Sequence, residues 1–563
     1  MKKILIIGGS AAGPKAAAKA RRCDETAEIT LVQKGGDLSM ASCGYPYYVG
    51  GVFDNRNMLL ATPTGAIRDP DFFRKVKNIE ALTHTEALEI NRDKKEVLCK
   101  DLNTLETFVK TYDKLILATG ASPRVPNVEG IDLEGISTLL SMSDADYLRK
   151  IRDEKKIKRA VVIGGGLIGI ETCEALQLAG IEVTIVEMLP QLLTFLDPEP
   201  AALVQNHIQS KSVHVITENG VKAFLGKDGK LTAVKLQNGT ELPCELAVLS
   251  VGVTPNSTLA KQAGLNVGKR GGVLVNKYMQ TSDPDIYAVG DCIEVPNRIT
   301  NESIHAPFGD LANLEGRVAG ENAATENRKT FSGTIQTGIC KIFEFSAGAT
   351  GLSEKSARQQ GFENIETVIN ASPDCPVFMG GKLLVSKLLV EKDSRRILGY
   401  QCVGPGDVSK QLATAAMAIT GNLTVDDVAN ADLPYAPPFS LAIDHFIASA
   451  HIMQNKLEGT MAGISCEEVH QNSCKKQNLF LLDVRSPAEF EEMRLGIGEV
   501  LIPLGALRTR LSDLPQDKDT PIVCYCKISL RGYEASLIVK AAGYTNVRVM
   551  EGGIMAWSYP REK

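Results

Sequence analysis

The chain has 563 residues, of which 44% are hydrophobic and 23% are charged, as in an ordinary globular protein. A formal charge of -5 and a pI near 6.0 give no sign of a nucleic-acid partner or of an anionic membrane surface. At roughly 150 residues per domain, the length predicts about four domains.

The N-terminus does not read as an export signal, because the apolar run covers only residues 4–7 and then meets glycines, whereas a secretory core is longer. No window is apolar and long enough to predict a transmembrane helix. We therefore expect a cytoplasmic protein without membrane insertion. The 13 cysteines include no repeated CxxC pairs, so neither a zinc site nor any other metal site is expected.

The first predicted unit is ILIIGGSAAGPKAAAKARR followed by EITLVQK, which is typical of a βαβ dinucleotide-binding unit. Gly8, Gly9 and Gly13 form its glycine-rich turn, although Ser10 stands at the second motif glycine and Gln33 stands where an acid is usual. Serine is small enough for close approach, and glutamine can still bond a ribose. The alternative is a packing turn without a ligand.

The next segment, SMASCGYPYYVG at residues 39–50, places Cys43 in a loop among small residues. A thiol near a helix N-terminus has a lowered pKa and reacts as a thiolate. The spacing alone nevertheless favours an ordinary small apolar cysteine. Farther along, DKLILATGASP at residues 113–123 predicts a strand that ends in a Thr-Gly turn.

A second unit, AVVIGGGLIGIETCEALQLAG followed by EVTIVEM, carries a complete GxGxxG in Gly164, Gly166 and Gly169. The glycines allow the tight turn, the approach of pyrophosphate to the helix N-terminus and close packing of helix on strand. Glu187 ends the following strand. Its carboxylate can bond a ribose 2′-hydroxyl and would repel a 2′-phosphate, which favours NADH over NADPH.

Later elements complete the domain prediction. DPDIYAVGDCIE at residues 283–294 is a strand running into a Gly-Asp turn, and an α+β pattern follows from about residue 331. We predict an α/β protein in which residues 1–112 and 251–326 form the domain of the first unit and residues 113–250 form the domain of the second. Residues 327–453 form an α+β domain, residues 454–462 a linker, and residues 463–563 a last domain.

The order of GGSAAG, SCGYPYY, ATGASP, GGGLIGIE and YAVGD resembles the flavin-dependent pyridine nucleotide-disulfide oxidoreductases over about residues 1–452. The resemblance implies two Rossmann-like domains, FAD in the first unit, a nicotinamide cofactor in the second, and a C-terminal dimerisation domain. It implies that Gly290 and Asp291 meet the ribityl chain of the flavin. The implied cofactor-binding residues are Gly8, Gly9, Ser10, Gly13, Gln33, Ala118, Thr119, Gly120, Gly290, Asp291, Gly164, Gly166, Gly169 and Glu187.

The branch of the family follows from the cysteine. Members with two redox thiols carry C-x4-C, but here Tyr48 stands five positions after Cys43. The loop resembles the SxANCxxPYY of coenzyme A-disulfide reductases, persulfide reductases, and NADH oxidases and peroxidases. Ser39 matches that pattern, whereas Ser42 replaces its asparagine. Both serines are candidate substrate contacts.

The resemblance also implies that Tyr435, in LPYAPPFS, enters the active site of the partner subunit of a homodimer, although a turn tyrosine packed beside prolines is the plainer alternative. A second family tyrosine is replaced by Phe378. Lys15, Lys19 and Arg22 share one helical face by spacing, where they can meet coenzyme A phosphates or be a solvated face.

The tail contains FLLDVRSPAEF and PIVCYCKISLRGY. Cys526 ends a predicted strand before a loop and a helix N-terminus, where backbone N–H groups stabilise a thiolate or persulfide, and Arg531 adds positive charge. These motifs and MEGGIMAW resemble single-domain rhodaneses over about residues 463–560. Cys524, two residues earlier, lies within the predicted strand and is interpreted as a packing residue.

Together the two resemblances are to fusions of a coenzyme A-disulfide reductase with a rhodanese domain. They imply that residues 1–112 and 251–326 are the first and second parts of an FAD-binding domain and that residues 113–250 are an NADH-binding domain. They also imply that residues 327–453 are a dimerisation domain, joined by the linker 454–462 to a rhodanese domain at 463–563. They imply that NADH reduces FAD, that the reduced flavin reduces a disulfide, persulfide or polysulfide on Cys43, and that Cys526 carries sulfane sulfur. Coenzyme A is a candidate further ligand, and a small thiol or persulfide is the expected substrate. The alternatives are an NADH oxidase or peroxidase with a cysteine sulfenate, and a sulfurtransferase or sulfur carrier with an attached flavin reductase.

Overall fold

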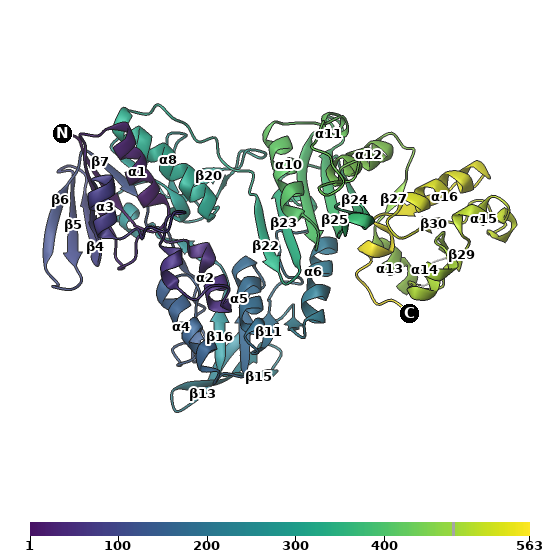
Figure 1. Cartoon of the computed structure of the whole chain (residues 1–563), viewed down its shortest axis with the longest axis horizontal. Helices are drawn as coiled ribbons and strands as arrows, with labels where there is room; N and C mark the ends of the chain where they lie inside the picture. The colour runs from purple at the N-terminus through teal and green to yellow at the C-terminus, as the bar shows by residue number, and fades with distance from the viewer. Residues whose placement is uncertain (476–478) are drawn as a thin grey trace. The chain divides into compact units, whose positions relative to one another are not determined.

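The computed structural model describes residues 1–475 and 479–563 (Figure 1). The chain divides into two compact units, the first made of Met1–Met188 and His214–Thr334, and the second of Leu189–Val213 and Ile335–Lys563. Each is described by itself. The fold class expected from the sequence is confirmed. In the described parts of the chain, no helix has both the length and the apolar character needed to cross a bilayer.

The first unit begins with a parallel five-stranded sheet in the order β19-β7-β1-β2-β3. Four of the five residues of β1 are buried, because this strand is covered on both faces. Helix α1 (Ala12–Cys23) packs along α8 (Gly309–Thr325), and small alanines and glycines allow this close contact. The strands are β1 (Lys3–Ile7), β2 (Glu28–Val32), β3 (Glu80–Leu82), β7 (Lys114–Leu117) and β19 (Ile286–Ala288).

A second parallel sheet in the same unit has the order β12-β11-β10-β16-β9. Helix α5 (Leu167–Leu178) follows β10 directly, as the second glycine motif predicts. The strands are β9 (Ile136–Ser137), β10 (Arg159–Ile163), β11 (Glu182–Val186), β12 (His214–Ile216) and β16 (Leu246–Leu249).

The first boundary expected between these domains lies too early. Strand β7 was assigned to the NADH-binding domain by the division at residue 113, but it pairs in parallel with β1 of the first sheet. The chain passes from the first domain to the second at β8 (Ala121–Pro123) and returns at β17 (Val253–Pro255). These two strands pair with each other. The segment KLIL is equally apolar in either domain, so its sequence does not say which sheet it joins.

The first unit also contains small three-stranded sheets. Two of them are antiparallel: β4 (Thr85–Asn91), β5 (Glu96–Asp101) and β6 (Thr107–Thr111); and β13 (Val221–Lys227), β14 (Lys230–Leu236) and β15 (Glu241–Pro243). In another, β20 (Ile293–Pro296) pairs in parallel with β18 (Val273–Leu274) and antiparallel with β21 (Ser303–Ile304). The remaining helices of more than five residues are α2 (Tyr45–Gly50), α3 (Pro70–Lys77) and α4 (Met142–Glu154).

The second unit contains an antiparallel five-stranded sheet in the order β22-β23-β26-β25-β24, which leaves β24 at one edge. Its strands are β22 (Gly338–Ile342), β23 (Phe345–Gly351), β24 (Ile365–Pro373), β25 (Leu383–Glu391) and β26 (Ile397–Gly404). The helices with it are α6 (Pro198–Ser210), α9 (Glu354–Gln359), α10 (Val408–Thr420), α11 (Val425–Ala429) and α12 (His445–Leu457).

Two features of this unit were not expected. Helix α6 belongs to the sequence between β11 and β12, yet it contacts β23, β25 and β26 of this sheet. Helix α12 runs to Leu457 and so extends into the segment 454–462 that was expected to be a linker.

The chain ends in a parallel five-stranded sheet of order β27-β31-β30-β28-β29, coloured yellow-green to yellow in Figure 1. Its strands are β27 (Gly463–Ile464), β28 (Phe480–Asp483), β29 (Val500–Leu501), β30 (Ile522–Tyr525) and β31 (Val547–Met550). Its helices are α13 (Cys466–Cys474), α14 (Pro487–Glu492), α15 (Leu504–Leu507) and α16 (Leu530–Ala541). A separate apolar core lies inside this domain.

Candidate active sites

Both glycine-rich turns have the geometry that a pyrophosphate needs. A β-carbon on Gly13 would lie 1.9 Å from the Gly8 carbonyl oxygen, and one on Gly169 would lie 2.0 Å from that of Gly164, so each third glycine allows helix and strand to pack closely. Neither α1 nor α5 has a side-chain cap at its N-terminus. Uncapped N–H groups at these two helix ends fit the phosphates of two dinucleotides.

The residues that directly follow β2 and β11 accept equivalent hydrogen bonds. The Gly9 N–H donates to the Gln33 Oε1 at 2.8 Å, and the Gly165 N–H donates to the Glu187 Oε2 at 2.7 Å. Each side chain therefore holds its own glycine-rich turn. Ser10 is exposed in the first turn, and no atom lies within 4 Å of the place for a β-carbon on Gly166 in the second. Both turns thus offer open space for a ligand.

Other expected flavin contacts lie in the turn that follows β7. A β-carbon on Gly8 would lie 1.9 Å from the Ala118 carbonyl oxygen, which places the ATG turn directly beside the first glycine-rich turn. Thr119 and Gly120, which has a φ of 68°, continue that turn, and Thr119 Oγ1 donates to the Asn256 carbonyl. These residues fit the FAD site implied by the sequence.

The Gly-Asp turn depends on a carboxylate that sequence reasoning missed. The Gly290 N–H donates to the Glu315 Oε2 at 2.7 Å, and burial raises the pKa of Glu315 to about 8. Burial likewise raises the pKa of the neighbouring Asp291. Glu315 lies inside an unremarked helical run, so no sequence motif marks it.

Cys43 lies between the two nucleotide motifs. It is exposed and belongs to the short 3-10 turn Ser42–Gly44 before α2. Its Sγ lies near the start of α8, because a β-carbon on Gly309 would lie 3.4 Å from that sulfur. Two carboxylates that influence the pKa of its thiol are Asp291, in the Gly-Asp turn expected to meet the flavin, and Glu171, on α5 just after the second glycine motif. One thiol is thus within electrostatic reach of both motifs.

The expectation of a lowered pKa at Cys43 is not met by the protein's own groups. Loss of hydration raises the pKa of the thiol, and the carboxylates of Glu171, Asp291 and Asp310 raise it further. These effects, of which loss of hydration is the largest, exceed the opposing effect of a backbone hydrogen bond to Cys43. The three acids come from three separate elements, so no local pattern in the sequence marks them beside the thiol.

Glu171 is a further site residue that the sequence analysis did not single out. Burial raises its pKa to about 7, against a smaller opposing effect of the Tyr47 hydroxyl, which donates to Glu171 at 3.3 Å. Glu171 stands two residues after Gly169, within GGGLIGIE, so the motif itself was the available signal.

The candidate substrate contacts differ in their surroundings. Ser39 has a φ of 52°, and its N–H donates to the Gly9 carbonyl, which ties the cysteine loop to the first glycine-rich turn. Ser42 begins the 3-10 turn that contains Cys43. Lys15 and Arg22 are exposed on α1, but the Lys19 ammonium forms a 2.8 Å ion pair with Glu321. Lys19 is therefore already paired with a carboxylate of α8.

In the second unit, Tyr435 and Phe378 are 56% and 78% exposed. Tyr435 lies in the extended segment before α12, and Phe378 lies in the 3-10 turn Val377–Met379. Phe439 is also exposed. Large apolar side chains exposed on a dimerisation-type domain are typical of a surface that another chain covers.

The sulfur-transfer site of the last domain is compact. Cys526 follows β30 directly and is buried, and Ser529 in its loop has a φ of 86°. The Arg531 guanidinium donates to both Glu489 oxygens at 2.7 and 2.8 Å, and these bonds lower the pKa of Glu489 to about 2. The hydrogen bond to Glu489 raises the pKa of Arg531, and Cys526 adds to that effect, so the guanidinium interacts electrostatically with the candidate nucleophile.

Two neighbouring groups are structural. Burial raises the pKa of Cys524 to about 12, as expected for a packing residue. Arg485 and Asp483 form an almost fully buried ion pair at 2.6 Å below the loop. Within the described residues, no group of three or more His, Cys, Asp or Glu side chains could hold a metal ion.

Comparison with known proteins agrees with this geometry. Residues 2–306 match the family model "Pyridine nucleotide-disulphide oxidoreductase", residues 337–446 match the dimerisation domain of that family, and residues 465–559 match the rhodanese-like domain. The NADH oxidase of Methanocaldococcus jannaschii is 32% identical over 81% of this chain and 99% of its own.

Two solved structures extend over both parts. The NAD-dependent persulfide reductase of A. fulgidus is 42% identical with a TM-score of 0.94, covering 99% of this chain and 100% of its own. The reduced Bacillus anthracis CoADR-RHD is 36% identical with a TM-score of 0.91, covering 99% and 97%. The chain therefore belongs to the pyridine nucleotide-disulphide oxidoreductase family and carries a C-terminal rhodanese-like domain.

Proposed function

We propose that this protein uses NADH to reduce a small persulfide, polysulfide or disulfide through Cys43, and that Cys526 supplies or accepts sulfane sulfur. The observation that carries the proposal is the position of one exposed thiol within electrostatic reach of both nucleotide motifs. The names of the A. fulgidus and B. anthracis proteins support a sulfur substrate. Their coenzyme A and persulfide chemistry makes coenzyme A persulfide a candidate.

Family membership implies FAD and a nicotinamide cofactor. The turn of Gly8–Gly13 with Gln33 would hold FAD, and the turn of Gly164–Gly169 with Glu187 would hold NADH. When bound, FAD supplies a two-electron carrier between NADH and sulfur. The protein supplies the rest of the chemistry through orientation and through its thiols.

The sulfur chemistry balances without another reagent. The Cys43 thiolate forms a bond to one sulfur of the substrate S–S bond, and the other sulfur leaves with the electron pair. Two electrons from NADH and one added proton then release the bound sulfur and restore Cys43. For a persulfide RSSH, the sum is RSSH, NADH and H⁺ giving RSH, H₂S and NAD⁺.

Glu171 is suited to exchange a proton near this chemistry, since its pKa of about 7 leaves it able to give or take one at neutral pH. The Cys43 thiol begins protonated because its pKa is raised. A nearby carboxylate that titrates at neutral pH provides a place for that proton.

We also propose a homodimer in a reducing cytoplasm, with Tyr435 from one subunit completing the site of the other. Its exposure, and the match to a family dimerisation domain, support this role. Ser39, Ser42, Lys15 and Arg22 remain candidate contacts for the substrate, whereas Lys19 is the weakest because of its ion pair with Glu321.

The decisive experiment compares substrates in anaerobic stopped flow. The NADH-reduced protein is mixed separately with a small persulfide, coenzyme A disulfide, oxygen and hydrogen peroxide, and the reoxidation rates are compared. The proposal expects the persulfide or the disulfide to react fastest. Fastest reaction with oxygen or peroxide would instead identify an NADH oxidase or peroxidase, the activity named for the M. jannaschii relative.

The two cysteines provide the first mutational prediction. Cys43→Ser is expected to abolish NADH-dependent sulfur reduction while retaining FAD and any thiosulfate-to-cyanide sulfur transfer, because the nucleotide turns and the rhodanese domain are untouched. Cys526→Ser is expected to do the reverse. Substrates that reach Cys43 directly should still turn over in Cys526→Ser, and substrates that need relayed sulfur should not.

Full turnover of every substrate by Cys526→Ser would rule out a relay and leave the rhodanese domain as an independent module. Loss of sulfur transfer in Cys526→Ser, with no NADH-dependent reduction of any sulfur substrate by the wild type, would favour a sulfurtransferase as the main activity.

A further inference from the structure

The edge strand of the dimerisation sheet contacts a carboxylate from the rhodanese domain. The Ile369 N–H of β24 donates to the Glu551 Oε2 at 2.9 Å, so the outward N–H of an edge strand is satisfied by a side chain more than 180 positions away. Glu551 is 3% exposed and lies directly after β31. A carboxylate buried this deeply needs partners.

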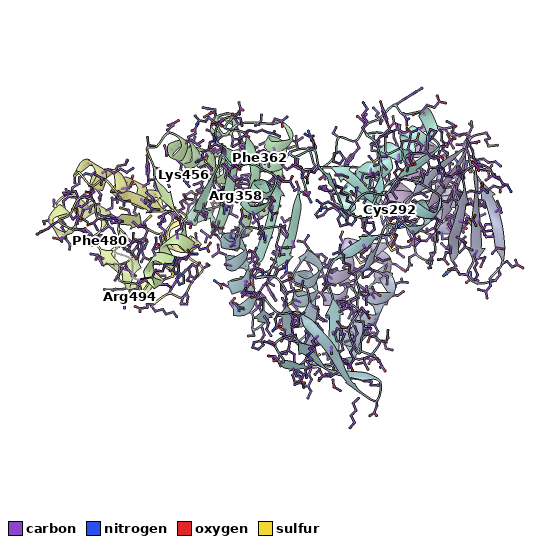
Figure 2. All side chains as sticks on the ribbon, turned by 180° about the vertical axis from the view of Figure 1, so that it is seen from behind. Cys292, Arg358, Phe362, Lys456, Phe480 and Arg494 are labelled. Carbon is purple, nitrogen blue, oxygen red and sulfur yellow. The ribbon has the colours of Figure 1, made fainter. Side chains whose placement is uncertain are left out.

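Lys456 supplies the second partner. Its Nζ lies 2.6 Å from the Glu551 Oε1, 3.0 Å from Glu366 and 2.6 Å from the Thr367 carbonyl oxygen. Figure 2 shows Lys456 on α12, at the side of the dimerisation domain where the rhodanese domain begins. One ammonium is shared by two carboxylates, and burial raises the pKa of Glu551 despite that cation.

Two glycines lie beside Glu551. A β-carbon on Gly463, which belongs to the rhodanese domain like Glu551, would lie 1.8 Å from the Glu551 Oε1, so a larger residue there would displace the carboxylate. A β-carbon on Gly552 would lie 2.9 Å from the Ile369 Cγ2 of β24, which shows how closely the two domains meet at this point. The rhodanese domain is seated on β24 and α12 by specific contacts around Glu551.

The residues on either side of Glu551 hold the nucleophile loop. The Ile554 and Met555 N–H groups donate to the carbonyl oxygens of Cys526 and Lys527 at 3.0 and 3.1 Å. Ser529 Oγ donates to the Met550 carbonyl at 3.0 Å. The backbone on both sides of Glu551 is thus bonded to the loop between Cys526 and Ser529.

We propose that Glu551, held by Lys456 and by the edge of β24, is a positioning residue for Cys526. Docking on the dimerisation domain then sets the geometry of the sulfur-transfer loop, and the rhodanese domain works at full rate only when it is seated. This inference rests on the proposed role of Cys526 as a sulfur carrier and adds to it a dependence on residues outside the rhodanese domain.

The test uses the full-length dimer and changes Lys456, because this residue lies outside the rhodanese domain and can be replaced without altering that domain's own sequence. Lys456→Met removes the cation from Glu551, and Lys456→Arg conserves it. Lys392→Met is the matched control, since Lys392 pairs with Glu366 of β24 at 3.1 Å, whereas the cation paired with Glu551 is Lys456. Arg531, the cation at Cys526, stays in place in every variant.

Three quantities are measured: the rate of Cys526 alkylation by iodoacetamide as a function of pH, the kcat and KM of thiosulfate-to-cyanide sulfur transfer, and NADH-driven reduction of a small persulfide. Lys456→Met is expected to lower the kcat of sulfur transfer by about tenfold to a hundredfold through misplacement of the nucleophile, with KM nearly unchanged. Its alkylation profile should shift along the pH axis, and Lys456→Arg should restore most of both.

Lys392→Met should match the wild type in all three measurements, and NADH-driven reduction should survive in every variant. Fluorescence of Trp557, the single tryptophan, checks that the rhodanese domain remains folded. Wild-type alkylation and wild-type kcat in both Lys456→Met and Glu551→Gln would overturn the proposal. If the wild type has no sulfur-transfer activity, the proposed role of Cys526 fails, whereas the alkylation comparison still decides whether the junction positions the thiol.

Discussion

Gln33 and Glu187 end equivalent strands and make equivalent hydrogen bonds, each accepting from the second residue of a glycine-rich turn. The amide therefore replaces the acid without loss of this bond. What distinguishes the two residues is charge. If the second turn binds the nicotinamide cofactor, the negative charge of Glu187 is the feature that opposes a 2′-phosphate.

This comparison suggests a variant that removes the charge and keeps the hydrogen bond. Glu187→Gln copies the residue already present at position 33 and retains an acceptor for the Gly165 N–H. The wild type is expected to favour NADH over NADPH by at least about tenfold in kcat/KM, about 1.4 kcal/mol, and Glu187→Gln should narrow that gap. Equal efficiency of the wild type with both cofactors would contradict the assignment.

The raised pKa of Glu171 makes the free energy of unfolding depend on pH. Its pKa in the folded protein is raised to about 7 from an unfolded value near 4.5. Between these values the folded state binds the extra proton, so this residue lowers stability as pH rises and reaches its full unfavourable effect above about 7. Glu171→Gln should therefore be more stable than the wild type by up to about 3 kcal/mol at alkaline pH.

The measurement is the melting temperature of both proteins across a pH series. The difference should grow from mildly acidic to mildly alkaline pH and vanish toward the unfolded pKa. Tyr47→Phe removes a hydrogen bond that lowers the pKa of Glu171 and should steepen the wild-type trend. A difference in melting temperature that is independent of pH would indicate that Glu171 does not titrate in this range.

At the scale of elements, α6 is held in the second unit by a buried cluster of charges. The Lys387 ammonium on β25 is 4% exposed and lies within 3.5 Å of Asp197 and Glu199, at the start of α6, and of Glu354 on α9. These carboxylates raise the pKa of Lys387 although burial opposes it. The lysine thus joins two helices to the sheet.

Lys387→Met should destabilise the second unit by about 3–5 kcal/mol, because it leaves three carboxylates without their buried cation. Lys392 is exposed and directly follows the same strand, and Lys392→Met should change stability by no more than about 0.5 kcal/mol. Thermal unfolding followed by circular dichroism provides the comparison. Similar melting temperatures for the two variants would show that the cluster contributes little.

The elements also show what sequence reasoning can reach. The glycine turns, the single-cysteine loop and the rhodanese loop are local patterns, so residues such as Gly164, Cys43 and Cys526 could be named in advance. Glu315 lies in a helical run without a motif, whereas Glu171 and Glu551 lie inside the motifs GGGLIGIE and MEGGIMAW. The roles of all three depend on contacts between distant segments, which a local pattern does not show. The placement of α6 and β7 escaped prediction for the same reason, since an apolar strand or amphipathic helix does not specify which sheet it covers.

At the scale of the whole molecule, the exposed apolar side chains of the second unit bear on assembly. Sedimentation at micromolar protein is expected to give a dimer of the 60.6 kDa chain, and Tyr435→Phe should slow the reductive step while leaving flavin content unchanged. The physical reason is the loss of one hydroxyl from a shared site without loss of ring packing. A stable monomer with full activity would refute the shared site.

The placement of α6 has a consequence for how the chain is made. The Asp197 N–H at the start of α6 donates to the side chain of Gln401, which lies 204 positions later on the sheet that α6 covers. At about 5–20 residues per second, a ribosome needs about 10–40 s to synthesise this stretch. Until then Ala201, Val204 and Ile208, which are buried in the finished protein, have no partner surface. The nascent chain therefore carries an uncovered helix in the middle of an otherwise complete first unit, and a fragment that ends at Thr334 would keep that helix uncovered permanently.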